Sequence, residues 1–357
     1  MRAERSAERL RVVGLWRGRL PRGCELCMRG LKVVVFVTGF CEANCYYCPV
    51  GIGRRDPDAL YVDEERVDSL DRVLEEIEVV GARGISITGG EPLSAIERVE
   101  KILRLVKDVY GQGFHVHLYT HGGYATREVL RRLDRLGLDE IRFHPRYPQS
   151  FRSLEYAARE TSMDVGVEVP AIPGAAEGLC KVAAYAERLG ARFININELE
   201  YSESNLPRIL LRGLRPVEGK PYVRGSLETA LEVMRCAEER GLAITVHFCP
   251  ALYKDLVQTR LRLLRKALSL AGPHEEVTDS GTLRTLEIPR GVYEELIDAL
   301  KRLGGIVLVG DGVAYLNPVM LRSLPREVVE VLERYGSYEE YYPSLTREAQ
   351  LVTEEGQ

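Results

Sequence analysis

Short β-branched segments alternate with amphipathic helical segments along most of this chain, and this alternation is the feature that most constrains its fold. Runs such as GISIT, FHVHLY and DVGVEV are each followed by a stretch with helical periodicity. Strands that alternate with helices predict βα units and a parallel sheet. We therefore expect an α/β fold whose strands form an open, partial (β/α)6-type barrel.

The expected elements of the barrel follow one another with short connections. The expected strands are 32–38, 84–88, 114–119, 140–143, 164–169, 193–197 and 243–248. The expected helices are 62–80, 94–110, 126–136, 150–159, 176–189, 226–240 and 251–270. Residues 198–224 lack periodicity, and a loop of this length is usually functional, so we interpret it as a lid or excursion.

Four regions are expected along the chain. They are an N-terminal extension with a C-x2-C pair (1–30), the barrel (31–271), a small C-terminal α/β appendage (272–345) and a frayed polar tail (346–357). The linker AGPHEEVTDSG marks the start of the appendage. Within the appendage we expect strands at 282–288 and 306–309 and helices at 291–302 and 321–334.

Composition excludes several classes of protein. No apolar stretch approaches the roughly 20 residues that cross a bilayer, and no signal peptide follows the charged N-terminus. We expect a cytoplasmic protein with no membrane partner. The net charge of −4 gives no global attraction to nucleic acid, although a local basic face could still bind it.

Eight cysteines occur in the chain, and five of them lie between Cys24 and Cys48. In a chain expected to be cytoplasmic, this clustering indicates metal or redox chemistry and not a disulfide framework. The other three, Cys180, Cys236 and Cys249, are scattered, and a lone cysteine is commonly a small buried hydrophobe.

The run Cys41-x3-Cys45-x2-Cys48 follows directly on the first expected strand. Three thiolates this close together can surround one soft metal centre. A structural zinc site would need a fourth protein ligand, whereas three cysteines leave one metal position open, as catalytic sites require. The alternative interpretation is a zinc knuckle.

The second expected strand ends in the turn TGGEPL, residues 88–93. Its glycines allow the backbone to approach a ligand closely, and Glu91 can accept a charge-assisted hydrogen bond from a ligand ammonium group. Alone, this could be an ordinary βα turn. Because the carboxyl ends of the strands form one face of an α/β barrel, we expect the turn and the cysteine run to share that face.

Together, the two motifs resemble the radical S-adenosylmethionine superfamily. The resemblance implies that Cys41, Cys45 and Cys48 hold a [4Fe-4S] cluster, which binds S-adenosyl-L-methionine and cleaves it reductively to a 5′-deoxyadenosyl radical. It also implies that Tyr47 lies beside the adenine. The turn residues that would bind the methionyl group are Thr88, Gly89, Gly90, Glu91 and Pro92.

The resemblance extends to later strands. LYTHG, with His121 in place of the family's asparagine, and GVEVPAIPG resemble the third- and fifth-strand regions of the superfamily. Thr120, Glu168 and Asn195 are accordingly expected to contact the cofactor. The alternative for each is a buried polar residue with no ligand.

Two further groups of residues are candidates for substrate or metal binding. His247 and Cys249 end the seventh strand, where a titratable cluster can bind substrate, and Cys249 could donate the hydrogen atom that quenches a substrate radical. Cys24 and Cys27 precede the first strand, so we expect them at the opposite end of the barrel. They could hold half of an auxiliary iron–sulfur cluster or zinc site, completed by Cys249, or be two unliganded thiols.

The substrate is left open by these motifs. The region CELCMRGLKVVVFVTGFCEANCYYCP most resembles uncharacterised archaeal proteins related to pyruvate formate-lyase activating enzymes. Modification of RNA or protein, small-molecule metabolism and activation of a glycyl-radical enzyme are alternatives, with a reductant such as ferredoxin or flavodoxin as partner. An iron–sulfur or zinc sensor without catalytic activity is an alternative of another class, against which Glu91 argues.

Overall fold

The computed structural model describes residues 10–300, 306–309 and 312–345. The tail expected at 346–357 lies outside these residues. The chain divides into two compact units, one of residues 1–78 and 82–259, the other of residues 79–81 and 260–357. The division falls ahead of the linker at which the sequence places the start of the appendage.

The first unit is built on a ten-stranded sheet in the order β1-β10-β9-β8-β7-β6-β5-β2-β3-β4. Its seven parallel strands are β2 (Lys32–Phe36), β5 (Gly84–Thr88), β6 (His115–Thr120), β7 (Glu140–Phe143), β8 (Asp164–Ala171), β9 (Phe193–Glu198) and β10 (Thr245–Cys249). The edge strands β1 (Leu15–Arg17), β3 (Tyr61–Val62) and β4 (Glu65–Arg66) are antiparallel. Among the described strands β1 and β4 do not pair, so the barrel is open, and the expected partial barrel is confirmed.

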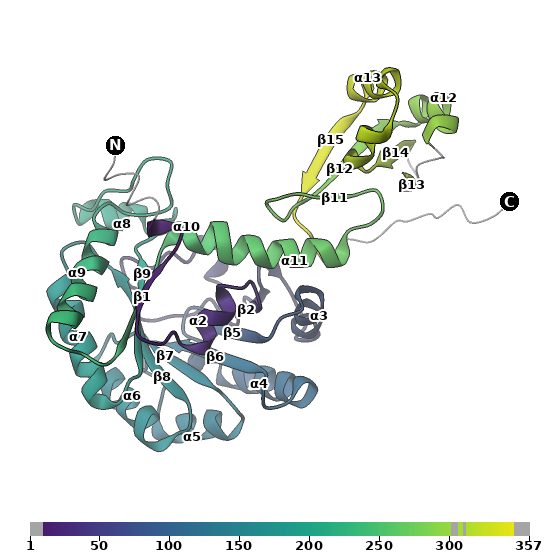
Figure 1. Ribbon diagram of the computed structural model, residues 1–357. Coiled ribbons are helices and arrows are strands. Elements are labelled where there is room, and N and C mark those ends of the chain that lie inside the picture. The colour runs from purple at the N-terminus through teal and green to yellow at the C-terminus, as the bar shows by residue number, and fades with distance from the viewer. Residues whose placement is uncertain (1–9, 301–305, 310–311, 346–357) are drawn as a thin grey trace. The chain divides into compact units, whose positions relative to one another are not determined.

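Helices cover the outer face of this curved sheet (Figure 1). They are α3 (Asp71–Val80), α4 (Ile96–Tyr110), α5 (Arg127–Arg135), α6 (Pro148–Glu160), α7 (Ala176–Leu189) and α9 (Ser226–Glu239). Most bounds agree with the sequence expectation, because each helix buries an apolar stripe and several end at glycine. Gly190, for example, closes α7 in the left-handed conformation with φ 102°.

The inner face of the sheet is polar. Alternate residues of each strand point inward, and on β9 and β10 these are Asn195, Asn197, His247 and Cys249. The intervening residues, such as Ile194, are fully buried under the helices. The apolar core of this unit therefore lies between sheet and helices, and the inside of the barrel is available for polar chemistry.

The prediction of a helix at 62–80 is wrong for the first half of that segment. The segment begins with the β3–β4 hairpin, in which Val62 pairs with Val35, and the helix starts only at Asp71. Asp63 forms the turn with φ 53°, and its Oδ1 accepts a hydrogen bond from the Val34 amide at 2.8 Å. Pairing with β2 overrides the helical periodicity of this stretch.

The prediction of one continuous helix at 251–270 is also wrong, because the segment has three parts. It consists of α10 (Ala251–Tyr253), a π-helical segment (Lys254–Thr259) and α11 (Arg260–Leu270). π-Helical segments occur frequently at functional sites. This one carries Lys254 and Gln258, which both line the cavity described below.

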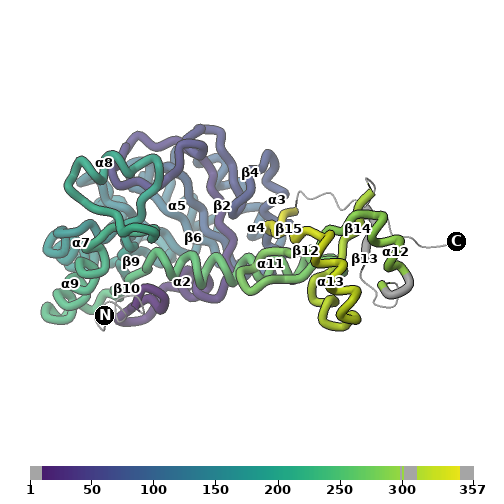
Figure 2. Tube along the Cα trace, turned by 90° about the horizontal axis from the view of Figure 1, so that it is seen from above, coloured from purple at the N-terminus to yellow at the C-terminus, as the bar shows by residue number. Residues whose placement is uncertain are grey.

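Two segments at opposite ends of the barrel strands complete the first unit (Figure 2). The short helix α2 (Arg22–Cys27), which the sequence did not indicate, lies against the first residues of the strands, with the Leu26 side chain beside Gly84. The excursion at 198–224 contains α8 (Leu206–Leu211) and has its own small core of Leu199, Ile209 and Val223.

A disulfide joins Cys180 on α7 to Cys236 on α9. The expectation that both are isolated hydrophobic cysteines is therefore wrong. The two residues are 56 positions apart in the sequence, and they meet because α7 and α9 pack side by side.

The second unit contains an antiparallel sheet with helices on one face. Its elements are α11, β11 (Glu276–Val277), β12 (Leu283–Pro289), α12 (Arg290–Leu300), β13 (Ile306–Val309), β14 (Val313–Leu316), α13 (Arg326–Tyr335) and β15 (Ser337–Tyr341). Leu286, Leu316 and Leu332 belong to its core. The helix expected at 321–334 begins later, after Pro325. Across the described parts of both units, every helix is too short or too polar to cross a bilayer.

Candidate active site

A cavity of about 500 Å³ opens inside the barrel of the first unit. It is lined by the cysteine loop 41–48, the turn after β5, and inward residues of the strands. The sequence-predicted residues that line it are Cys24, Cys27, Cys41, Cys45, Tyr47, Cys48, Thr88, Gly89, Gly90, Pro92, Thr120, Glu168, Asn195, His247 and Cys249. The structure thus brings both motifs, the later-strand candidates and the N-terminal cysteine pair to one cavity.

The residues that lead from β2 into the cysteine loop are joined to the glycine turn by backbone hydrogen bonds. The Gly90 amide donates to the Thr38 carbonyl and the Glu91 amide to the Phe40 carbonyl, each at 2.7 Å. A Cβ atom on Gly90 would lie 2.2 Å from the Phe40 oxygen, so only glycine permits this approach. The two motifs therefore form a single structural unit.

Cys41, Cys45 and Cys48 are all half-buried on the loop that follows β2. Asn44, between the first two, has φ 43°, a left-handed conformation that asparagine tolerates. Three thiols on one loop are a soft donor set with no fourth cysteine beside them, which fits an iron–sulfur cluster with one open position. Cys41 also has donor atoms of Glu42 and His121 within 4.8 Å, the grouping that a zinc site would use.

Of the five turn residues that the resemblance assigns to the methionyl group, Glu91 is the one that does not line the cavity. Its side chain is fully buried, and its carboxylate accepts hydrogen bonds from the Thr120 hydroxyl and the His121 amide at 2.7 Å and from the Leu93 amide at 3.0 Å. Burial raises the pKa of Glu91, and His121 opposes that effect. Glu91 consequently ties the turn to the end of β6, where Thr120 and His121 face the cavity.

Tyr47 is fixed by a histidine on β7. Its hydroxyl lies 2.8 Å from His144 Nε2, while His144 Nδ1 lies 2.9 Å from the Glu168 carbonyl oxygen. Because a carbonyl only accepts, Nδ1 carries the proton and the tyrosine hydroxyl donates to Nε2. The ring is thus positioned at the cavity wall, where the sequence expects the adenine.

Polar residues of β8, β9 and β10 form the opposite wall. Glu168 accepts hydrogen bonds from Arg142 at 2.9 Å, Asn195 at 3.1 Å and Asn197 at 2.8 Å. Burial opposes ionisation of Glu168, but Arg142 and the two amides lower its pKa below the ordinary value. Glu168 is therefore ionised at neutral pH, and its position is fixed by the three side chains that donate to it.

His247 lines the cavity and has one ring nitrogen without a partner. Its Nδ1 lies 3.1 Å from the Asn195 side-chain oxygen, whereas Nε2, although buried, has no partner among the described residues. Burial lowers the pKa of His247 to about 4, so the ring is neutral at pH 7. With the proton on Nδ1, Nε2 is a free acceptor for a hydroxyl or N–H group of a ligand.

Cys249 lies two residues further along the same strand face. Burial raises its pKa to about 12, so it is a thiol at neutral pH, and Gln258 Nε2 lies 3.6 Å from its sulfur. Lys254, on the same π-helical segment as Gln258, pairs with Glu200 at 2.6 Å. These groups give the cavity a charged, hydrogen-bonding side next to β10.

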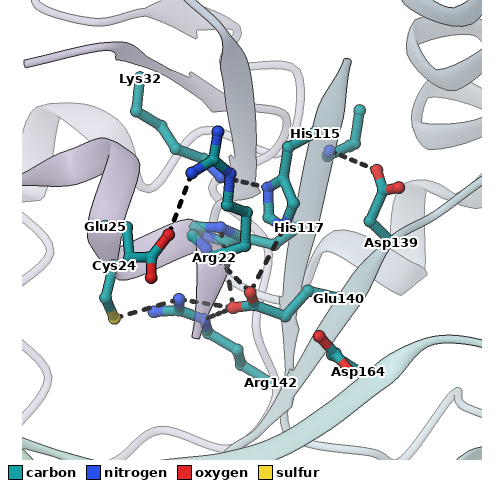
Figure 3. Close-up of polar contacts among 12 residues, drawn as sticks. Arg22, Cys24, Glu25, Lys32, His115, His117, Asp139, Glu140, Arg142 and Asp164 are labelled. Atoms are coloured by element: carbon teal, nitrogen blue, oxygen red, sulfur yellow. Dashed lines mark hydrogen bonds and ion pairs between the residues drawn. The ribbon is translucent and has the colours of Figure 1, made fainter. Parts of the chain in front are cut away.

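An ion network that the sequence did not indicate reaches the cavity through Cys24 and Arg142 and extends away from it into the barrel (Figure 3). The network, here called the floor cluster, consists of Cys24, Lys32, His115, His117, Glu140 and Arg142. Glu140 accepts from Arg142 Nε at 2.5 Å and from the Gly23 amide at 3.0 Å, and Lys32 Nζ lies 2.9 Å from His115 Nδ1. Alternating polar residues in HVHLYT, the sequence of β6, were the available signal.

The floor cluster is poorly suited to a metal ion, although donor atoms of His115, His117 and Glu140 lie within 4.8 Å of one another. The Glu140 carboxylate is already paired with the buried guanidinium of Arg142, and the Lys32 ammonium group is hydrogen-bonded to His115. Two cations at these positions would repel a third.

Cys24 and Cys27 lie at the N-terminal end of the strands, as expected, but on the same cavity as the cysteine loop. Cys24 Sγ accepts from Arg142 at 3.3 Å and from Asn195 at 3.4 Å, and burial raises its pKa. Within the described part of the chain, no group of three donor residues with atoms inside 4.8 Å includes either cysteine.

Comparisons with known proteins agree with this geometry. Residues 35–154 match the sequence profile of the radical SAM superfamily. Over 278 residues the chain is 37% identical to "Putative glycyl-radical enzyme activating enzyme MJ0021" of Methanocaldococcus jannaschii, and the match covers 74% of this chain and 72% of that protein.

Similar solved structures are more distant. Two structures of TsrM, a radical S-adenosylmethionine methyltransferase from Kitasatospora setae, share 17% and 15% identity, with TM-scores of 0.36 and 0.37. The matches cover 57% and 74% of this chain and 42% and 58% of those chains, so the chain spans less than two thirds of their length. The profile and the M. jannaschii relative carry the assignment: the chain belongs to the radical S-adenosylmethionine superfamily and is an enzyme that uses a [4Fe-4S] cluster and S-adenosyl-L-methionine.

Proposed function

We propose that the cavity of the first unit is where this enzyme cleaves S-adenosyl-L-methionine, and that Cys41, Cys45 and Cys48 are the three protein ligands of the cluster. The observation that carries this proposal is the hydrogen-bonded union of the cysteine loop with the turn at Gly90, at the wall of one cavity. When bound, the cluster supplies the electron that breaks the cofactor into methionine and a 5′-deoxyadenosyl radical.

Different residues of the cavity bind different parts of the cofactor. Thr88, Gly89, Gly90 and Thr120 face the cavity and receive the methionyl group, while Glu91 holds their backbone from behind. Tyr47, fixed by His144, forms the adenine side. The polar wall that includes Glu168 and Asn195 keeps its own charges paired and offers hydrogen-bonding groups to the bound cofactor.

On the substrate side we propose His247 and Cys249. The free Nε2 of His247 accepts a hydrogen bond from a substrate hydroxyl or N–H group, and a protonated Cys249 thiol stands next to it on the same strand face. A substrate bound there lies inside the barrel with the cofactor. A reductant outside the chain, such as ferredoxin or flavodoxin, must supply the electron, because an electron spent on cleaving the cofactor has to be replaced.

Anaerobic reconstitution tests the proposal. Protein loaded with iron and sulfide is mixed with dithionite and S-adenosyl-L-methionine, and 5′-deoxyadenosine is measured by chromatography. We expect turnover for the wild type and none for a Cys41→Ala variant. A wild-type protein with a spectroscopically confirmed cluster and no 5′-deoxyadenosine would contradict it.

A second candidate is supported by the name of the M. jannaschii relative, which designates an enzyme that activates a glycyl-radical enzyme. In that case the group that reaches His247 is a glycine of a partner protein. Electron paramagnetic resonance of the mixture decides, because activation gives a stable glycyl radical on the partner. With deuterated glycine in the partner, mass spectrometry should find one deuterium in 5′-deoxyadenosine.

An auxiliary metal at Cys24 and Cys27 is a separate proposal, supported by the position of both thiols on the cavity. A Cys41/Cys45/Cys48 triple-Ala variant, reconstituted in the same way, should retain iron or zinc if it is correct. Metal-free protein would exclude it. We further propose a cytoplasmic location, because six of the eight cysteines are free thiols, as a reducing compartment favours, and the Cys180–Cys236 disulfide is the exception; fractionation of the host cells tests it.

A further inference from the structure

The excursion at 198–224 is bonded to the backbone of the cysteine loop. The Asn205 side-chain amide donates to the Tyr47 carbonyl oxygen at 3.0 Å. The Ser204 hydroxyl donates to the Cys48 carbonyl oxygen at 3.4 Å. Two consecutive carbonyl groups of the loop, the second of them on an expected cluster ligand, therefore accept hydrogen bonds from this segment.

Two further contacts lie on either side of this pair. Arg208 on α8 donates to the Asn44 side-chain oxygen at 2.9 Å. The Glu203 carboxylate accepts a hydrogen bond from the Ile52 amide at 3.2 Å. In addition, Tyr47 packs against the small core of the excursion. The contacts thus cover the second half of the cysteine loop and the residues that follow it.

The start of the cysteine loop is held by a different element. The residues that lead into it, Thr38 and Phe40, accept hydrogen bonds from the amides of the glycine turn. The two sets of bonds do not overlap, so the loop is fixed at its entry by the turn and at its exit by the excursion. Groups that orient metal ligands in this way are commonly as important to a site as the ligands.

Asn205 is the central residue of the second set. Its side chain is fully buried, and its Oδ1 accepts from the Ser202 amide at 2.8 Å. Its Nδ2 donates to the carbonyls of Tyr47 and Glu200 at 3.0 and 3.1 Å. Only this orientation of the amide satisfies all three partners. Because Glu200 pairs with Lys254 beside the proposed substrate side, one amide joins that side to the cysteine loop.

A mobile lid is the competing interpretation of the excursion. Its base is closed, because the Val223 amide donates to the Leu199 carbonyl at 2.9 Å and the Leu199 amide donates to the Ser226 hydroxyl at 2.7 Å. Leu199 and Val223 also belong to the core of the segment. Opening would break the bonds to the Tyr47 and Cys48 carbonyls, so the contacts favour a fixed segment.

We infer that Asn205 is a positioning residue for the cluster. It holds the backbone between Tyr47 and Cys48 and thereby fixes the direction of the third thiolate. The inference rests on the proposed function, because it requires the cluster on Cys41, Cys45 and Cys48. Asn205 does not line the cavity and acts only through the cysteine loop.

Asn205→Leu tests the inference, because it replaces the amide by an apolar side chain of similar size. The reconstituted full-length protein is mixed anaerobically with an iron chelator, and the fading of cluster absorbance gives the rate of iron release. We expect release roughly 2- to 12-fold faster than from the wild type, the effect of one lost hydrogen bond to the loop. The electron paramagnetic resonance spectrum of the dithionite-reduced cluster should also change, because it depends on the orientation of the ligand thiolates.

Asn317→Leu is the matched control, because Asn317 makes the same three kinds of bond in the second unit. Its Nδ2 donates to the Pro273 and Glu275 carbonyls, and its Oδ1 accepts from the Val319 amide. This variant should release iron at the wild-type rate. Unchanged release from Asn205→Leu would overturn the inference. Equally fast release from both variants would also overturn it, because the effect would then be a general loss of stability.

Hydrogen exchange of the reconstituted wild type is a second test that needs no variant. The Ile209 amide on α8 (Leu206–Leu211) donates to the Asn205 carbonyl at 2.9 Å. A fixed segment predicts slow exchange in peptides that span α8, with the same rate before and after S-adenosyl-L-methionine is added. Fast exchange that becomes slow only with the cofactor would overturn the inference in favour of a lid. Failure of the proposed function appears separately, as a loaded cluster that gives no 5′-deoxyadenosine with dithionite.

Discussion

At the scale of residues, the cavity is organised by side chains that hold other groups in place. Glu91 is the clearest case. The sequence predicts that its carboxylate contacts a ligand, but in the structure the carboxylate accepts hydrogen bonds from Thr120, His121 and Leu93. Motifs identify which residues gather at a site. They do not show which way a side chain turns, because that depends on donors supplied by a neighbouring strand.

Glu91→Gln tests this role. The amide NH2 would face the His121 N–H donor, and a buried unsatisfied donor costs roughly 1–3 kcal/mol, so we expect a lower melting temperature together with weaker binding of S-adenosyl-L-methionine. Calorimetric melting and titration calorimetry on the reconstituted protein measure both. A variant with normal stability and weak binding would instead place Glu91 in direct contact with the cofactor.

His247 should make stability depend on pH. Its pKa is about 4 in the folded protein and about 6.5 in the unfolded chain, so between these values the unfolded state binds more protons and stability falls as the solution is acidified. A shift of this size corresponds to about 3 kcal/mol. In denaturant titrations of cluster-free protein at pH 7 and pH 4.5, His247→Gln should lose less stability on acidification than the wild type. Equal losses would contradict the neutral, buried state of the ring.

At the scale of elements, the βα repeats were predictable because each strand and helix carries its own periodicity. α7 and β7 have the expected bounds. The β3–β4 hairpin was not predicted, because the conformation of Val62 and Asp63 depends on their contacts with Val35 and Val34 on β2, which are distant in the sequence. The π-helical segment was missed for a similar reason, since its composition is that of an ordinary amphipathic helix.

The disulfide between α7 and α9 should stabilise the first unit. Closing a loop of 56 residues removes chain entropy from the unfolded state, worth about 4 kcal/mol in the chain-entropy treatment. We expect Cys236→Ser, or the wild type treated with a strong reductant, to melt at a lower temperature. Thiol counting by mass spectrometry under denaturing conditions is the control, and equal melting temperatures with a confirmed bond would contradict the expected stabilisation.

At the scale of the whole molecule, the active-site cavity belongs to one unit. All of its lining residues lie between Cys24 and Gln258, ahead of the division at residue 259. The sequence indicated the N-terminal position of the C-x2-C pair, but not that α2 would bring both thiols to the same cavity. Such a placement depends on how α2 packs against the first residues of the barrel strands, which no local pattern records.

A protein that ends at residue 271 should therefore still form 5′-deoxyadenosine with dithionite. The second unit has its own core around Leu286 and Leu316, so its removal deletes no residue of the cavity. Chromatography of the reconstituted truncated protein against the full-length enzyme provides the measurement, with iron content as the control for cluster loading. Loss of activity at normal iron content would assign the second unit a part in the reaction.

The polar interior of the barrel has a thermodynamic consequence. Exposing apolar surface on unfolding raises the heat capacity, whereas exposing polar surface lowers it. Arg142, Glu140, His117 and Asn195 occupy volume that aliphatic side chains would fill in an apolar barrel. The heat-capacity change of this unit should fall below that of an apolar barrel of equal size, so its stability curve is flatter and the fold persists over a wider span of temperature.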